Sequence, residues 1–152
     1  MVDTGNILIS VEGRHAASMV CGTKMVELRR RAIRAPSGCR VWIYSKTPRG
    51  SLEALGIVAK TVEAAPEELW KQYGAQCAIA LHEFESYFAG ITLGCAILFR
   101  KFYRLNPVLS LGDIRAKYSS FQPPQFFKKL PDNCPELTLF LSALPSHTCI
   151  NG

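Results

Sequence analysis

The chain of 152 residues lacks the marks of a secreted, membrane-spanning or zinc-binding protein. No two of its six cysteines are spaced two to four residues apart, as zinc ligands usually are. No segment approaches the roughly 18 continuous apolar residues that cross a bilayer, and residues 1–10 lack the basic start of a secretory leader. We therefore expect a cytoplasmic protein with reduced thiols, no metal, no cofactor and no membrane partner.

The chain also lacks internal repeats, low-complexity segments and an obvious linker. Its length is that of one domain, and its 48% hydrophobic residues are enough to build a core without disulfides. We expect a single domain over residues 1–152. It would consist of a core over about 5–130, a C-terminal helix within 131–146 and a frayed tail over 147–152.

The positive charge is confined to the first third of the chain. The formal net charge is +6, and residues 1–50 hold nine Lys and Arg against three acidic residues, whereas residues 51–152 hold nine of each. A localised basic surface is typical of proteins that bind a polyanion. Nucleic acid is therefore the favoured partner, and a basic loop that only promotes solubility is the alternative. The oligomeric state is left open.

Alternating and helical patterns together predict the α+β class. Strands are expected at 7–11, 24–31, 40–45, 52–62 and 93–103, and Asn106-Pro107 is expected to end the last of them. Helices are expected at 14–21, 65–73, 82–88, 111–117, 125–130 and 136–144. Gly56, inside a strand, indicates a bulge or a close contact. Because short strands need protected edges, we predict a small, mostly antiparallel β-barrel flanked by several short helices.

Residues 24–31 are the strongest candidate for a binding strip. On an extended strand, Glu27, Arg29 and Arg31 share one face, and the other face holds Val26, Leu28 and Arg30. A carboxylate between two arginines can orient their guanidinium groups through charge-assisted hydrogen bonds. The segment is therefore either a strip that contacts phosphates and bases, or an edge strand that its charges protect from aggregation.

Two further segments carry polar groups that suit nucleic acid. Between Tyr44 and Gly50, small polar residues with Lys46 and Arg49 predict a loop with exposed amides and two cations, and Tyr44 could stack on a base. A helix opened by Pro123-Pro124 would present free amides to an anion. The structural alternatives are a core tyrosine and a helix that docks through its phenylalanines.

Taken together, these segments resemble the ASCH family of PUA-like domains over about residues 5–130. The matching pieces, in chain order, are Gly22 with Lys24, Val26-Glu27-Leu28-Arg29-Arg30-Arg31, Val41-Trp42-Ile43-Tyr44, Thr47-Pro48, Pro66-Glu67-Glu68-Leu69-Trp70, Phe84-Glu85-Ser86-Tyr87-Phe88 and Phe121-Gln122-Pro123-Pro124-Gln125. The chain departs from the family pattern at Met25, where threonine is frequent, and at Phe126, where serine often follows. The resemblance implies a small barrel with a cleft over its mouth.

The resemblance also implies roles for particular residues. It places Lys24, Glu27 and Arg29 on one side of the cleft, with Tyr44, Lys46 and Ser120 reaching it from elsewhere. The candidate catalytic residues are Lys24, Glu27, Tyr44 and Lys46. The candidate nucleic-acid-binding residues are Arg29, Arg31, Ser45, Arg49, Ser120 and Gln125. We expect an RNA-binding domain whose basic cleft accepts a nucleotide or a single-stranded segment. The alternative is a metal-independent ribonuclease, or an amidohydrolase acting on RNA or a modified nucleoside, as some relatives are reported to be.

Catalysis would require particular chemical groups. A ribonuclease needs a base for the ribose hydroxyl, an acid for the leaving oxygen and cations for the developing negative charge. The three histidines lie outside the cleft segments, although His15 is near the cleft on the first helix. All three are expected at the surface or on a helix face: His15, His82 and His147. A lysine crowded by Arg29 and Arg49 could act as the base instead. An amidohydrolase would need Lys24 and Glu27 to polarise a water molecule.

Overall fold

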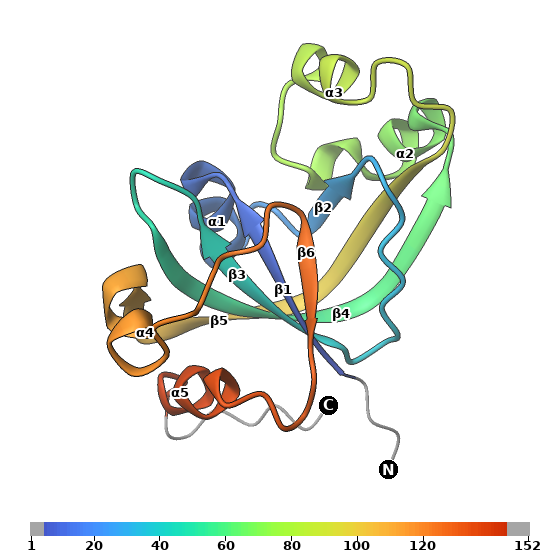
Figure 1. Ribbon diagram of the computed structural model, residues 1–152. Coiled ribbons are helices and arrows are strands. Elements are labelled where there is room, and N and C mark those ends of the chain that lie inside the picture. Colours follow the sequence, from blue (N-terminus) through green and yellow to red (C-terminus); the bar gives the residue numbers. More distant parts are fainter. Residues whose placement is uncertain (1–4, 146–152) are drawn as a thin grey trace.

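The computed structural model describes residues 5–145, and its centre is one six-stranded mixed sheet. The strand order across the sheet is β2-β5-β4-β3-β1-β6. The strands are β1 (Asn6–Val11), β2 (Val26–Arg29), β3 (Arg40–Ser45), β4 (Ser51–Ala64), β5 (Gly94–Ser110) and β6 (Phe127–Leu130). The pair β1–β3 is parallel and the other four pairs are antiparallel. The sheet curls into a half-barrel (Figure 1), so the predicted α+β class and the mostly antiparallel, partly closed barrel are confirmed.

Short helices flank the sheet at its two ends. They are α1 (Gly13–Val20), α2 (Pro66–Tyr73), η1 (Gly74–Gln76), α3 (Leu81–Tyr87), α4 (Leu111–Lys117) and α5 (Glu136–Ser142). Figure 1 shows α2 and α3 together at one end of the sheet, beyond β2, and α4 and α5 at the opposite end. None of the helices within residues 5–145 is long and apolar enough to cross a membrane. The tail expected at 147–152 lies outside the described residues.

Side chains on both faces of the sheet are buried. One cluster joins alternate residues of β1 and β3 to α1 and includes Ile7, Ile9, Val11, Met19, Val41 and Ile43. The intervening residues pack on the other face with α4 and α5, in a cluster that includes Leu8, Trp42, Tyr44, Ile114 and Phe140. Since β1 is covered on both sides, its six residues are all buried, which explains its nearly continuous apolar sequence.

A third cluster determines which way β2 faces. Val26 and Leu28 pack with Leu69 of α2 and Phe84 of α3. Because neighbouring side chains on a strand point to opposite faces, Glu27 is directed away from this cluster, toward the end of β1. The predicted division of this strand into an apolar and a charged face is therefore observed.

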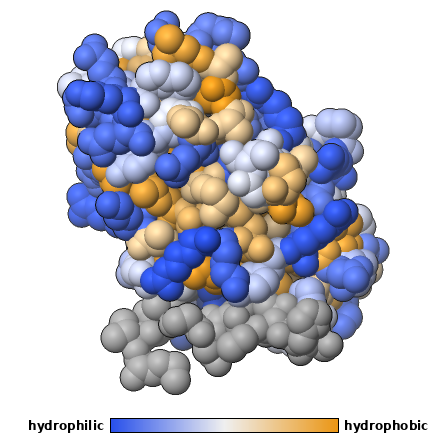
Figure 2. Space-filling model, turned by 180° about the vertical axis from the view of Figure 1, so that it is seen from behind, coloured by the Kyte–Doolittle hydropathy of each residue, from blue (hydrophilic) through white to orange (hydrophobic). Residues whose placement is uncertain are grey.

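Hydrophobic residues are not all hidden by this arrangement. On the face seen from behind, they gather across the middle, and hydrophilic residues lie around them in separate groups (Figure 2). This face therefore presents no continuous hydrophilic surface.

The helix predicted at residues 125–130 is absent from the described fold, and that prediction is wrong. Residues Phe127–Leu130 form β6, which pairs antiparallel with β1. Leu130 is buried, whereas Phe127 is exposed, as expected for an edge strand with one covered face. The Pro123-Pro124 segment is a loop, so the predicted anion site at a helix start is wrong as well.

The strand β5 also runs further than its sequence indicates. It continues through Pro107 to Ser110, because a register shift between Leu52 and Ala54 leaves several β5 residues opposite a single β4 residue. In such a bulge a proline removes no ladder hydrogen bond. Gly56 is a close-contact position, since a Cβ there would lie 2.7 Å from the rings of Phe99 and Phe102.

Candidate functional site

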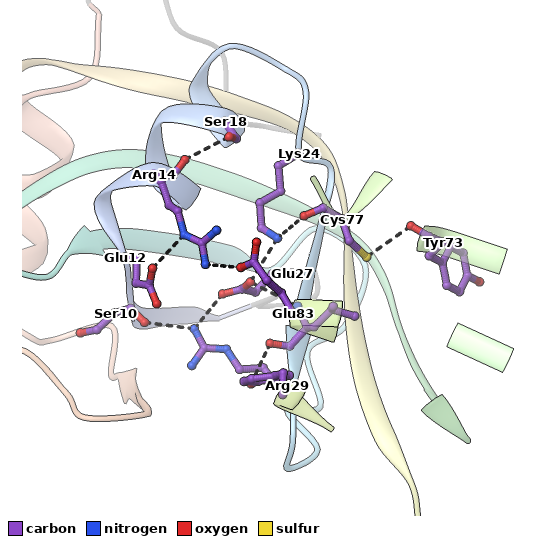
Figure 3. A network of polar contacts seen from close by, with 12 residues as sticks. Ser10, Glu12, Arg14, Ser18, Lys24, Glu27, Arg29, Tyr73, Cys77 and Glu83 are labelled. Carbon is purple, nitrogen blue, oxygen red and sulfur yellow. Dashed lines mark hydrogen bonds and ion pairs between the residues drawn. The ribbon is translucent and has the colours of Figure 1, made fainter. Parts of the chain in front are cut away.

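A pocket of about 180 Å³ lies where α1, β2 and α3 meet, beside the C-terminal end of β1. Charged side chains from separate elements converge on it (Figure 3). The charged residues that line it are Glu12, Arg14, Lys24, Glu27, Arg29, Lys46 and Glu83. Cations and carboxylates are nearly balanced, so the pocket is mixed in charge rather than uniformly basic.

Lys24 is a buried lysine in the wall of this pocket. Its side chain is 2% exposed, and its Nζ donates a hydrogen bond of 2.6 Å to the main-chain carbonyl of Cys77. The turn at Gly22, where φ is +85°, redirects the chain after α1 and delivers Lys24 to this position. Lysine is almost never fully buried without a partner. The partner is Glu27, whose Oε1 lies 3.7 Å from Nζ.

Glu27 is held between two cations. Its Oε2 accepts a hydrogen bond of 3.0 Å from Nη2 of Arg29, while its Oε1 faces Lys24 and accepts from the main-chain N–H of Leu28 at 3.2 Å. The predicted carboxylate between cations is present, with Lys24 in place of Arg31 as the second cation. These contacts fix the orientation of the carboxylate and of both cations.

Arg29 connects the pocket to the open side of the half-barrel. Besides Glu27, its guanidinium donates to the carbonyl of Ser10 at 3.2 Å and to the carbonyl of Phe126 at 3.3 Å. Its Nε is buried and has no hydrogen-bond partner among the described residues. Arg29 therefore neutralises Glu27 in the pocket and also holds the segment before β6 in place.

The rim of the pocket is closed by a second set of ion pairs. Arg14 lies 2.9 Å from Glu12 and 2.6 Å from Glu83, and so links α1 to α3. Hydrogen bonds from Arg14 lower the pKa of both carboxyls. The exposed Lys46 completes the rim, and its backbone N–H donates to the carbonyl of Val11 at 2.8 Å.

His15 lines the pocket, so the expectation that the histidines lie outside the cleft is wrong for this residue. It is half-buried on α1, and burial lowers its pKa, with the positive charge of Lys24 adding to the effect. The imidazole is therefore neutral at pH 7 and keeps one nitrogen free of a proton. In the sequence, the indication of this position is that His15 follows Glu12 by three residues, in a helix that comes directly after a buried strand.

The far wall comes from the segment around α3, which sequence reasoning also missed. Ile79, Glu83 and Tyr87 line the pocket, and the hydroxyl of Tyr87 donates to the carbonyl of Leu28 at 3.1 Å. Burial raises the pKa of this tyrosine. More than fifty residues separate these side chains from Lys24, and no local pattern links them.

Four predicted residues are brought together in the pocket, and six are not among its lining. The four are Lys24, Glu27, Arg29 and Lys46. Tyr44 is 3% exposed on the opposite face of the sheet, in the cluster with Trp42, and burial raises its pKa. Ser45 is buried, and its Oγ has no hydrogen-bond partner within residues 5–145.

The remaining predicted residues lie on the outside. Arg49 pairs with Glu53 at 3.4 Å, and Arg31 lies over the ring of Phe126. Two others are exposed in the loop between α4 and β6: Ser120 and Gln125. Within residues 5–145, no group of three or more His, Cys, Asp or Glu side chains is arranged to hold a metal ion.

Comparisons with known proteins agree with this fold. No family model matches the chain. It is 29% identical over 123 residues to an "ASCH domain-containing ribonuclease" of Zymomonas mobilis, which covers 81% of this chain and 82% of the relative. A crystal structure of ASCH from Zymomonas mobilis superposes with a TM-score of 0.86 at 26% identity, over 94% of this chain and 98% of the other.

A more distant structure shares the fold alone. The N-terminal domain of McrB from Thermococcus gammatolerans, bound to m5C DNA, superposes with a TM-score of 0.53 at 11% identity. The alignment covers 91% of this chain and 97% of that one.

Proposed function

Since the chain carries an ASCH domain, we propose that its pocket binds one nucleotide of single-stranded RNA. The observation that carries the proposal is the buried group formed by Lys24, Glu27 and Arg29, which points fixed donors and acceptors into a small pocket. The similarity to a relative named as a ribonuclease supports RNA as the polymer.

The size of the pocket suits one base rather than a duplex. Protein cavities of about 150 Å³ hold one benzene-sized ring, so about 180 Å³ has room for a single heterocycle. Sequence-specific RNA recognition mostly targets unpaired bases that can turn out of the stack. A single-stranded segment is therefore the form of RNA that fits.

The chemistry of the pocket suits the edge of a base. A base presents donors and acceptors side by side, and a pocket with only cations would satisfy the acceptors alone. Here Glu27 supplies an acceptor, whereas Lys24 and Arg29 supply donors. Because ion pairs already hold these groups, little side-chain freedom is lost on binding. The exposed Lys46 at the rim is free to contact a phosphate.

Equilibrium binding tests the proposal. Fluorescence anisotropy with a labelled single-stranded RNA hexamer, at low and physiological salt, compares the wild type with Glu27→Gln and Lys46→Ala. Both variants are expected to bind at least fivefold more weakly, and Lys46→Ala also to reduce the salt dependence. The matched control is Lys60→Ala, an exposed lysine of β4 outside the pocket. A wild type that binds no RNA at low salt contradicts the proposal.

A second candidate function is RNA cleavage, which the named relative and His15 both favour. A neutral imidazole can accept the proton of a ribose 2′-hydroxyl, and nearby cations can stabilise the negative charge that develops on phosphorus. Four cations line the pocket with His15: Arg14, Lys24, Arg29 and Lys46.

A cleavage assay separates this candidate from binding alone. Labelled RNA is incubated with the wild type and with His15→Asn, each with and without a chelator. Cleavage that His15→Asn loses while it still binds RNA supports catalysis. Intact RNA after incubation with the wild type leaves binding as the function. The amidohydrolase alternative stays a prediction, with Lys24 and Glu27 as its candidate pair.

A further inference from the structure

An exposed aromatic residue, Phe126, contacts the pocket residue Arg29 through its main-chain carbonyl, on the open side of the half-barrel. Phe126 is 58% exposed, and Phe127, which begins the edge strand β6, is 37% exposed. The guanidinium of Arg31 lies over the ring of Phe126, with Cζ 5.6 Å from the ring centre. We call Arg31, Phe126 and Phe127 the Phe126 strip. Exposed aromatic groups that adjoin cations are typical of surfaces that bind single-stranded nucleic acid.

The backbone of the strip is fixed although its rings are exposed. The carbonyl of Phe126 accepts a hydrogen bond of 3.3 Å from Arg29, and the preceding Pro124 carbonyl accepts one of 2.6 Å from the hydroxyl of Ser10. Phe127 is paired with Ile9 of β1. A ring on an anchored backbone can receive a base without a large loss of chain freedom.

Arg29 makes the strip continuous with the pocket. The same guanidinium contacts Glu27 inside the pocket and the Phe126 carbonyl at the strip. An RNA strand with one base in the pocket would therefore pass over Arg29 toward Phe126. The guanidinium of Arg31, which is exposed, is available there for a phosphate or for stacking.

We propose that the Phe126 strip is a second nucleotide subsite, in which the base next to the one in the pocket stacks on Phe126 while Arg31 contacts the phosphate. This inference rests on the proposed function, and it extends the ligand from a single nucleotide to a segment of at least two. Because stacking involves the face of a base and not its hydrogen-bonding edge, the subsite adds affinity for RNA of any sequence.

The experiment compares a short and a long ligand on matched variants. Wild type, Phe126→Ala, Phe126→Trp and Leu141→Ala are titrated with a nucleoside 5′-monophosphate and with a labelled single-stranded RNA hexamer. Leu141→Ala is the control, because Leu141 is 39% exposed on α5, at the other end of the sheet (Figure 1). A thermal melt confirms that each variant is folded.

The expected result is a selective loss. Phe126→Ala binds the hexamer about tenfold more weakly, as removal of one stacking platform predicts, and binds the monophosphate as the wild type does. Phe126→Trp retains hexamer binding, and its added indole fluorescence is quenched by RNA. Leu141→Ala changes neither affinity.

Other results overturn the inference in distinguishable ways. If Phe126→Ala binds the hexamer as tightly as the wild type while Glu27→Gln does not, the strip is no subsite and the pocket stands. If Phe126→Ala weakens both ligands equally, the strip is not a separate subsite. If the wild type binds neither ligand, the strip and the proposed function fail together.

Discussion

The guanidinium of Arg29 donates a hydrogen bond of 3.2 Å to the main-chain carbonyl of Ser10, although their strands are not neighbours in the sheet. Three strands, β5, β4 and β3, separate β2 from β1 in the strand order. A side chain thus spans the open side of the half-barrel, where a closed barrel would have a ladder of backbone hydrogen bonds. The shape of the barrel and the charge balance of the pocket consequently depend on the same residue.

The first prediction concerns this bridge. Arg29→Lys keeps the charge but replaces two separate donor nitrogens, Nη1 toward Phe126 and Nη2 toward Ser10 and Glu27, with a single one. The free energy of unfolding should therefore fall by about 1–3 kcal/mol. Urea denaturation measures the loss. Hydrogen exchange should also become faster in β6, whose position the bridge supports. The control is Arg34→Lys, at an exposed arginine, which should change stability by less than about 0.5 kcal/mol.

The two faces of the strand that carries Arg29 could be predicted from local sequence. Alternation placed Glu27 and Arg29 on one face of β2 and the apolar residues on the other, and the third hydrophobic cluster holds that orientation. Local sequence does not indicate in the same way that Lys24 is the second cation beside Glu27. Lys24 precedes the strand, and its direction depends on the turn at Gly22 and on the distant carbonyl of Cys77.

The second prediction ranks the members of the buried ion pair. Glu27→Gln leaves the buried Lys24 without a carboxylate, which should lower the free energy of unfolding by about 3 kcal/mol. Lys24→Met should cost less, about 1–2 kcal/mol, because Arg29 still neutralises Glu27. Urea denaturation of the two variants gives the ranking. A larger loss for Lys24→Met would show that Arg29 does not compensate for the missing lysine.

The third prediction tests the close packing at Gly56. Gly56→Ala places a methyl group 2.7 Å from the rings of Phe99 and Phe102, so the free energy of unfolding should fall by about 1–3 kcal/mol. Gly112→Ala, in α4, is the matched control. A Cβ at Gly112 would lie 3.7 Å from Ser110 Oγ, which is an ordinary van der Waals distance. The control should be neutral or slightly stabilising. Thermal melts of both variants distinguish the two effects.

The fourth prediction concerns the pH dependence of stability. Burial lowers the pKa of His15 in the folded protein below its unfolded value of about 6.5. At pH values between the folded and the unfolded pKa, the unfolded chain therefore binds more protons than the folded protein does. The free energy of unfolding should therefore fall as the pH drops through this window, and this contribution should be level above it. The carboxyls of Glu12 and Glu83, whose pKa values are lowered, lose their contributions at more acidic pH.

Denaturation of the wild type and His15→Asn at pH 7.5, 6.5 and 5.5 isolates this contribution. The wild type should lose more stability between pH 6.5 and 5.5 than the variant. Groups that are present in both proteins contribute equally and cancel in the comparison. Equal losses would show that the imidazole of His15 is as free to protonate in the folded protein as in the unfolded chain.

Long-range pairing explains the elements that sequence patterns misjudged. In residues 127–130 the two apolar residues are three apart, which fits one face of a helical turn, and only the pairing with β1, more than a hundred residues away, selects the strand. Pro107 signals the end of a strand, but the register shift opposite Leu52 accommodates it. The contribution of α3 to the pocket, through Glu83 and Tyr87, also could not be predicted from local sequence patterns.

The cations of the first third do not form one exposed basic surface in the folded protein. Their most informative member, Lys24, is buried and paired, whereas Arg30 and Arg31 are exposed outside the pocket. The first third thus supplies the cations that line the pocket, and burial distinguishes Lys24 and Arg29 from the exposed arginines. The single domain and the cytoplasmic location stay predictions.

A titration followed by nuclear magnetic resonance shows whether the pocket binds a nucleotide. Amide signals of ¹⁵N-labelled protein are recorded as each of the four nucleoside 5′-monophosphates is added. Binding of one nucleotide in the pocket predicts saturable shifts confined to the residues around it, including Glu12, His15, Glu27, Leu28 and Lys46. Binding in the pocket is contradicted if no monophosphate shifts these signals, or if the shifts gather instead at the hollow near Asn6 and Lys129, at the far end of β1.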